Sequence, residues 1–197
     1  MSLSAHAHLF RDTKGETRAG PVRTITKQEL EEASKLDSYY DGRWPYFEKV
    51  IEIVEREKPR YVLELGPYKM PIVKDSDIMD MKQNVENLTY LHDATQTPWP
   101  IEDKKYDMFI ALQVWEHLEG KEREAFEQVM RVSKSAILSF PYMWNCPQEP
   151  SHHMIDARKI AEWTLNVSPK EVIEVGIRII YFFKFDKNSE GAGLPQH

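Results

Sequence analysis

The chain has 197 residues, of which 41% are hydrophobic and 29% are charged, so it holds enough apolar material for one globular domain of ordinary size. No stretch approaches the roughly 20 consecutive apolar residues of a membrane-spanning helix, and the formal net charge of −6 disfavours a nucleic-acid backbone as the main partner. Cys146 is the single cysteine, which excludes an internal disulfide and a cysteine metal cage.

The N-terminal part of the chain predicts a polar arm and then a helical cap over residues 26–58. Residues 1–25 are polar and lack both hydrophobic periodicity and the apolar core of a secretory signal, so we expect a flexible arm. Thr26 and Glu29 have the spacing of a capping box at the start of a first helix. A second helix is expected from Pro45 onward, with an apolar stripe formed by Phe47, Val50, Ile51 and Val54.

From residue 60 onward, short β-rich runs alternate with helical patterns, which is typical of a parallel sheet covered by helices. Two final runs joined at Gly176 predict an antiparallel hairpin. We therefore expect an α/β, Rossmann-like fold with a mostly parallel, doubly wound sheet in a single domain at 26–186, followed by a flexible tail at 187–197. Strands are expected at 60–65, 76–81, 88–92, 106–112, 135–140, 171–175 and 178–185, and helices over 121–132 and after Asp156.

Acidic residues and a glycine stand at the ends of the first three predicted strands, where such sheets bind ligands. Gly66 allows close backbone approach, and the Glu64 carboxylate is suited to a cationic ammonium or sulfonium. Asp80, or alternatively Asp77, is suited to ribose hydroxyls, and Asp93 to an exocyclic amine. Each residue also has an ordinary structural alternative as a turn former, a helix cap or a solvated acid.

The segment from Tyr61 to Tyr142 resembles the class I S-adenosylmethionine (SAM)-dependent methyltransferases, in particular the small-molecule type 11 and type 12 enzymes. The residues that carry the resemblance are Glu64 and Gly66, Asp80, Asp93-Ala94, Tyr106-Asp107 through Glu116-His117-Leu118, Met130-Arg131-Val132 and Ser139-Phe140-Pro141. The resemblance implies SAM as cofactor, S-adenosylhomocysteine as product, and methyl transfer to a small-molecule acceptor by in-line displacement.

The resemblance also implies which residues form the site. His117 is the candidate catalytic base, with helix-start packing as the alternative. The expected cofactor contacts are Glu64, Gly66, Pro67, Asp80, Asp93, Ala94 and Gln113. The expected substrate pocket, rich in rings that suit a small aromatic or sugar-like acceptor, comprises Tyr40, Trp44, Glu116, Tyr142, Trp144 and His153.

The remaining expectations concern metals, partners and location. His152 and His153 lie near Glu149 and Asp156, but adjacent histidines seldom bind one ion, so we predict no metal. The expected partner is a small-molecule acceptor, not nucleic acid or a membrane, and a homodimer is a candidate assembly. A lone cysteine suits the reducing cytoplasm, where we expect the protein to act.

The glycine-rich turn of the family is shortened in this chain. Gly66 is followed by Pro67 and Pro71, and only 14 positions separate Gly66 from Asp80, against about 20 in a full turn-helix-strand unit. The first crossover helix is therefore expected to be very short or absent. This departure motivates an alternative function, in which a methyltransferase-like domain has lost catalysis and serves as a binding or assembly module.

Overall fold

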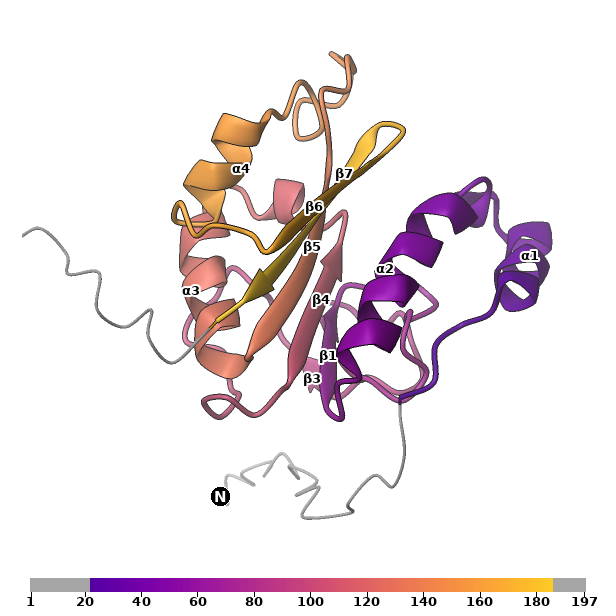
Figure 1. Ribbon diagram of the computed structural model, residues 1–197, viewed down its shortest axis with the longest axis horizontal. Helices are drawn as coiled ribbons and strands as arrows, with labels where there is room; N and C mark the ends of the chain where they lie inside the picture. Colours follow the sequence, from indigo (N-terminus) through magenta and orange to yellow (C-terminus); the bar gives the residue numbers. More distant parts are fainter. Residues whose placement is uncertain (1–21, 186–197) are drawn as a thin grey trace, which may run out of the picture.

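The computed structural model describes residues 22–185, so most of the predicted arm and all of the predicted tail lie outside the described residues. The described residues form a seven-stranded sheet of order β3-β2-β1-β4-β5-β7-β6 (Figure 1). Strands β1 to β5 are parallel, whereas β7 is antiparallel to both β5 and β6. This arrangement confirms the predicted fold. The strands are β1 (Val62–Leu65), β2 (Asp77–Asp80), β3 (Tyr90–Leu91), β4 (Met108–Leu112), β5 (Ser135–Pro141), β6 (Glu171–Val175) and β7 (Arg178–Lys184).

The helices begin where the sequence provides caps. At the start of α1, the Thr26 hydroxyl accepts from the Glu29 amide while the Glu29 carboxylate accepts from the Thr26 amide, so the capping box is confirmed. At the start of α4, the Asp156 carboxylate accepts from the Lys159 amide, a side-chain cap without the reciprocal bond. None of the helices within residues 22–185 is long and apolar enough to cross a membrane. The helices are α1 (Lys27–Leu36), α2 (Trp44–Glu57), α3 (Glu122–Val132) and α4 (Ala157–Trp163), with 3₁₀ turns η1 (Ser38–Tyr40) and η2 (Trp115–His117).

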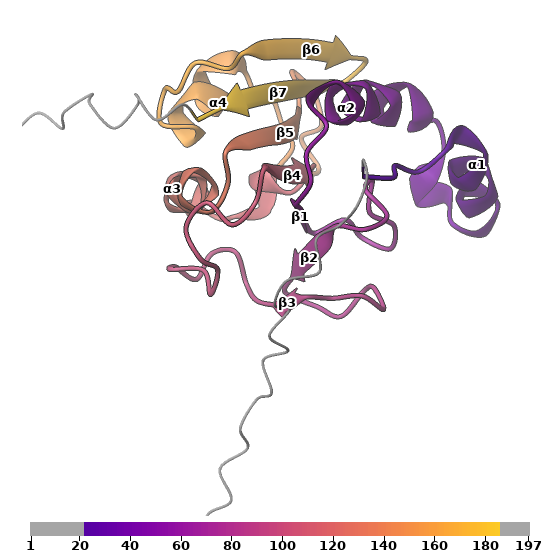
Figure 2. The same ribbon diagram turned by 60° about the horizontal axis from the view of Figure 1, so that its bottom comes forward.

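Helices cover both faces of the sheet, α2 on one side and α3 with α4 on the other (Figure 2). Successive side chains of a strand point to opposite faces, so Phe109 of β4 packs in the core beneath α3 while Ile110 packs in the core beneath α2. Both side chains are almost completely buried. This double burial explains why the central strands are continuously apolar.

The connections after β1, β2 and β3, all of which the structure describes, contain no helix. The first of them, residues 66–76, confirms the expectation that the crossover helix is very short or absent. The connections at 81–89 and 92–107 depart from the predicted alternation of strands and helices. The β2–β3 edge of the sheet is therefore bordered by loops (Figure 2).

The paired part of the chain starts before α1, earlier than the predicted boundary at residue 26. Thr24 forms an antiparallel bridge with Val73, and the Ile25 amide donates to the Ile72 carbonyl at 2.9 Å. The Ile25 side chain is only 5% exposed. These residues lie against the first connection because that loop, having no helix, offers free backbone groups for pairing.

Candidate functional site

A cleft of about 590 Å³ lies at the carboxyl ends of β1, β2, β3 and β4. Parallel α/β sheets bind ligands at this edge, and the volume lies within the roughly 300–1,000 Å³ of small-molecule sites. Five of the seven residues expected to contact a cofactor line the cleft, namely Gly66, Asp80, Asp93, Ala94 and Gln113.

Gly66 forms the turn that leaves β1. Its φ is +57°, a left-handed conformation that favours glycine, and its amide donates to the Met79 carbonyl at 2.9 Å. A Cβ at this position would lie 3.2 Å from Cγ2 of Val114. The missing side chain therefore allows β1 to turn closely against the loop that follows β4.

Asp80 lies at the cleft end of β2 and is 7% exposed. Its carboxylate accepts from the Lys82 amide at 2.9 Å and from the Asn84 side-chain amide at 3.4 Å. Asp77 begins the same strand at its opposite end, where it accepts from the Tyr106 hydroxyl at 2.6 Å. Of the two acids that the sequence left as alternatives, Asp80 is the one at the cleft.

Asp93 and Ala94 form the wall of the cleft that follows β3. One Asp93 oxygen accepts from the Thr95 amide at 2.9 Å and from the Thr95 hydroxyl at 2.8 Å, which holds the pKa of this carboxyl below its usual range. The Ala94 carbonyl accepts from the indole nitrogen of Trp99 at 3.0 Å. Asp93 is thus an oriented anion facing the cleft.

Gln113 follows β4 with a φ of +58° and forms hydrogen bonds to the neighbouring strand β5. Its main-chain and side-chain nitrogens each lie 3.2 Å from the Ser139 hydroxyl oxygen, and its main-chain amide also donates to the Ser139 carbonyl. The Tyr46 hydroxyl of α2 contacts the same Ser139 oxygen. Gln113 is therefore held in place at the cleft by the neighbouring strand.

Glu64 and Pro67, the other two expected cofactor contacts, do not line this cleft. Glu64 is 2% exposed, and its carboxylate accepts from the amides of Ile72 and Val73 at 2.8 and 2.7 Å and from the Ser76 hydroxyl at 3.0 Å. Burial raises the pKa of Glu64 to about 7, against the opposing effect of these donors. Glu64 thus anchors the shortened connection instead of lining the cleft. Pro67, together with Glu64, lines an adjoining hollow of about 20 Å³ that shares Tyr39, Leu65 and Gly66 with the cleft.

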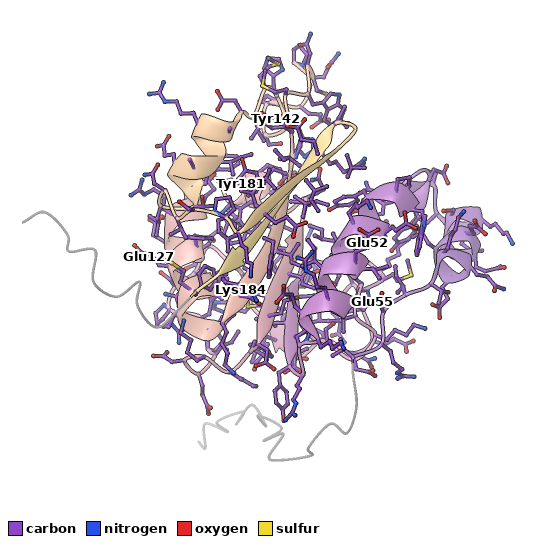
Figure 3. The ribbon with its side chains drawn as sticks, in the orientation of Figure 1. Glu52, Glu55, Glu127, Tyr142, Tyr181 and Lys184 are labelled. Atoms are coloured by element: carbon purple, nitrogen blue, oxygen red, sulfur yellow. The ribbon has the colours of Figure 1, made fainter. Side chains whose placement is uncertain are left out.

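Several of the expected substrate-pocket rings do not line the cleft. Tyr40 is 3% exposed and packs edge-on against Tyr39, and the Trp44 indole donates to Glu48 on its own helix. Tyr142 lies where β5 ends, at the opposite end of the sheet from Lys184 (Figure 3). None of the four expected rings, Trp144 included, lines the cleft among the described residues.

A pair of rings lies at the Gly66 end of the cleft: Tyr39, which belongs to the ring-rich N-terminal segment expected at the acceptor pocket, and Tyr68, which sequence reasoning missed. Tyr39 and Tyr68 line the cleft with their centroids 4.5 Å apart, and the Tyr68 hydroxyl donates to Asp37. The sequence could have indicated these lining residues, because they lie within a few positions of the predicted strand ends or of Tyr40. The other missed lining residues are Leu65, Met81, Lys82, Asn84, His92, Thr95, Val114, Leu118 and Glu119.

His117 lines the cleft, and three more of the candidate residues gather around it. Its Nε2 lies 3.2 Å from Nε2 of His152, which in turn is 3.7 Å from a carboxylate oxygen of Glu116. Burial, with the nearby His152 as a second cause, lowers the pKa of His117. The Trp144 ring stacks on His152 at 5.7 Å. Glu116 and Trp144 therefore belong to a histidine cluster at the edge of the cleft.

The histidine grouping weighed from the sequence does not form. His153 accepts from the Cys146 amide through Nδ1, at 3.1 Å. Asp156 caps α4 through its carboxylate. The loop after β5 thus directs His152 toward Glu116 and His117, residues that are more than 30 positions away in the sequence.

Comparisons with known proteins find the fold but no close relative. No protein-family model matches the chain. No curated protein matches it either. Among solved structures, the chain is similar to the N-methyltransferase NodS from Bradyrhizobium japonicum WM9, solved with S-adenosyl-L-homocysteine, at 12% identity and a TM-score of 0.58, covering 80% of this chain and 96% of that one.

Two further similar structures extend the comparison. A SAM-dependent methyltransferase from Clostridium acetobutylicum has 10% identity and a TM-score of 0.56, covering 80% of this chain and 98% of that one. The 16S rRNA methylase RmtB has 15% identity and a TM-score of 0.53, and the match covers 82% of this chain and 76% of that one. Together with the strand order, these likenesses show that the chain has the Rossmann-like fold of SAM-dependent methyltransferases.

Proposed function

We propose that this protein is a SAM-dependent methyltransferase that acts on a small-molecule acceptor. The observation that carries the proposal is the cleft itself, in which a turn glycine and two carboxylates converge from three successive strand ends of a methyltransferase-type sheet. SAM, when bound, supplies an activated methyl group for in-line displacement by an acceptor nucleophile. Positioning then provides most of the rate enhancement.

The residues present fit such a cofactor. Gly66 lines the cleft without a side chain, so a ligand can approach the backbone of this turn closely. Asp80 retains acceptor capacity beyond its two bonds, because each carboxylate oxygen has two lone pairs. The second oxygen of Asp93 accepts no hydrogen bond from any residue within 22–185. Asp80 would bind ribose hydroxyls and Asp93 the exocyclic amine of adenine.

His117 is the candidate base for the acceptor. It lies on the cleft, and its lowered pKa favours the neutral imidazole that can take a proton. A small-molecule acceptor is supported by the net charge of −6, since an acidic chain attracts phosphate backbones poorly. One structural neighbour is an rRNA methylase, but that neighbour's acceptor need not be shared on a common fold.

Calorimetric titration with SAM and S-adenosylhomocysteine tests the proposal. Asp80→Ala and Asp93→Ala should each weaken binding by about 1–3 kcal/mol, the cost of leaving a buried partner unpaired. Glu86→Ala is the matched control, because Glu86 is an exposed acid of the loop after Asp80 that does not line the cleft, and it should leave the affinity unchanged.

Two results would contradict the proposal in different ways. Unchanged affinity in both aspartate variants would place the cofactor outside this cleft. No binding of either ligand to the unaltered chain at millimolar concentration would instead favour the alternative, a methyltransferase-like binding or assembly module.

A further inference from the structure

Three side chains of metal-binding type converge at the edge of the cleft. Glu116 and His117 belong to η2, directly after β4, and His152 belongs to the loop after β5. One ligand atom from each lies within 4.8 Å of the other two. The closest approach is 3.2 Å between the two imidazole Nε2 atoms, followed by 3.7 Å from His152 to Glu116.

These separations suit shared coordination of one ion. Two imidazole nitrogens bound at about 2.05 Å in a tetrahedral site lie about 3.3 Å apart, close to the observed nitrogen–nitrogen distance. The carboxylate is slightly farther away and would draw closer around a cation. Trp144 stacks on the His152 ring with an interplanar angle of 20°, which fixes the plane of that ligand.

Glu116 gives an independent reason to place a cation here. Its side chain is 0% exposed, and neither carboxylate oxygen forms a hydrogen bond with any residue in the described part of the chain. A buried carboxyl group without donors is strongly unfavourable in its ionised form, so it either keeps its proton or has a cation beside it. A cation between Glu116 and the two histidines would supply that compensation.

We propose that Glu116, His117 and His152 bind one divalent transition-metal ion at the edge of the cleft. Two imidazole nitrogens and one carboxylate oxygen suit Zn²⁺, Co²⁺, Fe²⁺ or Mn²⁺, whereas Ca²⁺ and Mg²⁺ prefer oxygen ligands. Because His117 also lines the cleft, the ion would lie where it could activate an oxygen or nitrogen nucleophile of the acceptor. With the ion bound, Nε2 of His117 would be a ligand, and the ion would replace this residue as the activating group. That consequence rests on the proposed function, but ion binding does not.

Titration of the metal-free full-length chain with Co²⁺ tests the proposal directly. We expect visible d–d absorption that saturates at one equivalent and is displaced by Zn²⁺ but not by Mg²⁺. Glu116→Gln, His117→Gln and His152→Gln should each weaken Co²⁺ binding by more than about 100-fold, since loss even of outer-shell partners costs 10–100-fold.

Matched control variants exclude other cobalt-binding groups in the chain. His153→Gln removes the histidine adjacent to His152, which accepts from the Cys146 amide, and should keep the absorption. Cys146→Ser should keep it as well. A combined His6→Ala and His8→Ala variant removes a histidine pair of the N-terminal sequence and should also leave the saturating signal intact.

The proposal is overturned if millimolar Co²⁺ gives no saturable absorption, or if Glu116→Gln and His152→Gln bind as tightly as the unaltered chain. Circular dichroism identifies any variant that fails to fold, and the remaining ligand variants then decide the outcome. All these titrations are made without SAM. A chain that binds cobalt but not SAM would contradict only the proposed function, and one that binds SAM but not cobalt only the metal site.

Discussion

At the scale of single residues, Glu64 shows how a motif position can serve the fold. The connection after β1 has no helix, so its amides lack intrahelical acceptors. Glu64 supplies the acceptor for two of them and for a hydroxyl, at the centre of the protein. A carboxylate that would face the ligand in the expected site therefore stabilises the loop that replaces a helix.

The raised pKa of Glu64 predicts a specific pH dependence of stability. The pKa is about 7 in the folded chain against an ordinary value of 4.5, so between these values the folded state keeps a proton that the unfolded state releases. The contribution of Glu64 to the free energy of unfolding should therefore fall by about 3 kcal/mol as pH rises from 4.5 to 7.

Urea unfolding of Glu64→Gln across this pH range isolates the effect. The uncharged side chain should make the profile shallower by about the contribution of Glu64, and the remaining slope should come from other buried acids such as Glu116, whose pKa is raised to about 8. Glu86→Gln, at an exposed acid, should reproduce the profile of the unaltered chain. A Glu64→Gln profile as steep as that of the unaltered chain would show that the carboxyl does not titrate in this way.

At the scale of elements, two turns of similar backbone conformation face different surroundings. Gly66 has a φ of +57° and a neighbouring Val114 side chain at 3.2 Å from a built Cβ. Gly176, in the β6–β7 hairpin, has a φ of +59° and open space around the same position. The first turn is thus constrained by both backbone and packing, and the second by backbone alone.

Replacement of each glycine by alanine should separate the two constraints. Gly176→Ala should lower the free energy of unfolding by about 1–2 kcal/mol, the cost of a left-handed conformation for an L-residue. Gly66→Ala should cost more, because Val114 must also shift, and it should narrow the cleft. If chemical denaturation shows the same loss of unfolding free energy for both variants, the Val114 side chain moves aside without an energetic cost.

At the scale of the whole molecule, the sheet order brings separate strand ends to one edge. Strand β1 lies between β2 and β4, so Gly66, Asp80 and Gln113 meet although 47 positions separate the first from the last. Helices cover both faces of the sheet, which leaves the carboxyl edge as the place for a ligand (Figure 1).

A ligand bound at this edge should stabilise the entire domain. At a SAM concentration of 100 times the dissociation constant, the free energy of unfolding should rise by about 2.7 kcal/mol, which corresponds to a melting temperature higher by roughly 5–10 °C. Asp80→Ala at the same SAM concentration should show a smaller rise in the melting temperature, measured by scanning calorimetry. An unchanged melting temperature of the unaltered chain in millimolar SAM would contradict cofactor binding.

Local patterns in the sequence were sufficient for most of the architecture. The capping box at Thr26, the Asp156 cap and the hairpin at Gly176 are interactions between near neighbours, so their spacing alone predicts them. The missing first helix also followed from spacing, since Gly66 and Asp80 stand too close for a full crossover. The site residues at strand ends were predictable because parallel strands share one ligand-binding edge.

The sequence by itself determined the order of strands and helices and placed a glycine and acids at the strand ends. Only the tertiary structure decided which of these side chains face the cleft. In the folded chain, Glu64 accepts hydrogen bonds from the first connection, and Asp77 lies at the end of β2 opposite to the cleft. His152 lies beside Glu116 and His117. The reason is physical: a side chain's hydrogen-bond partners and burial depend on residues distant in the chain, and no local pattern specifies them.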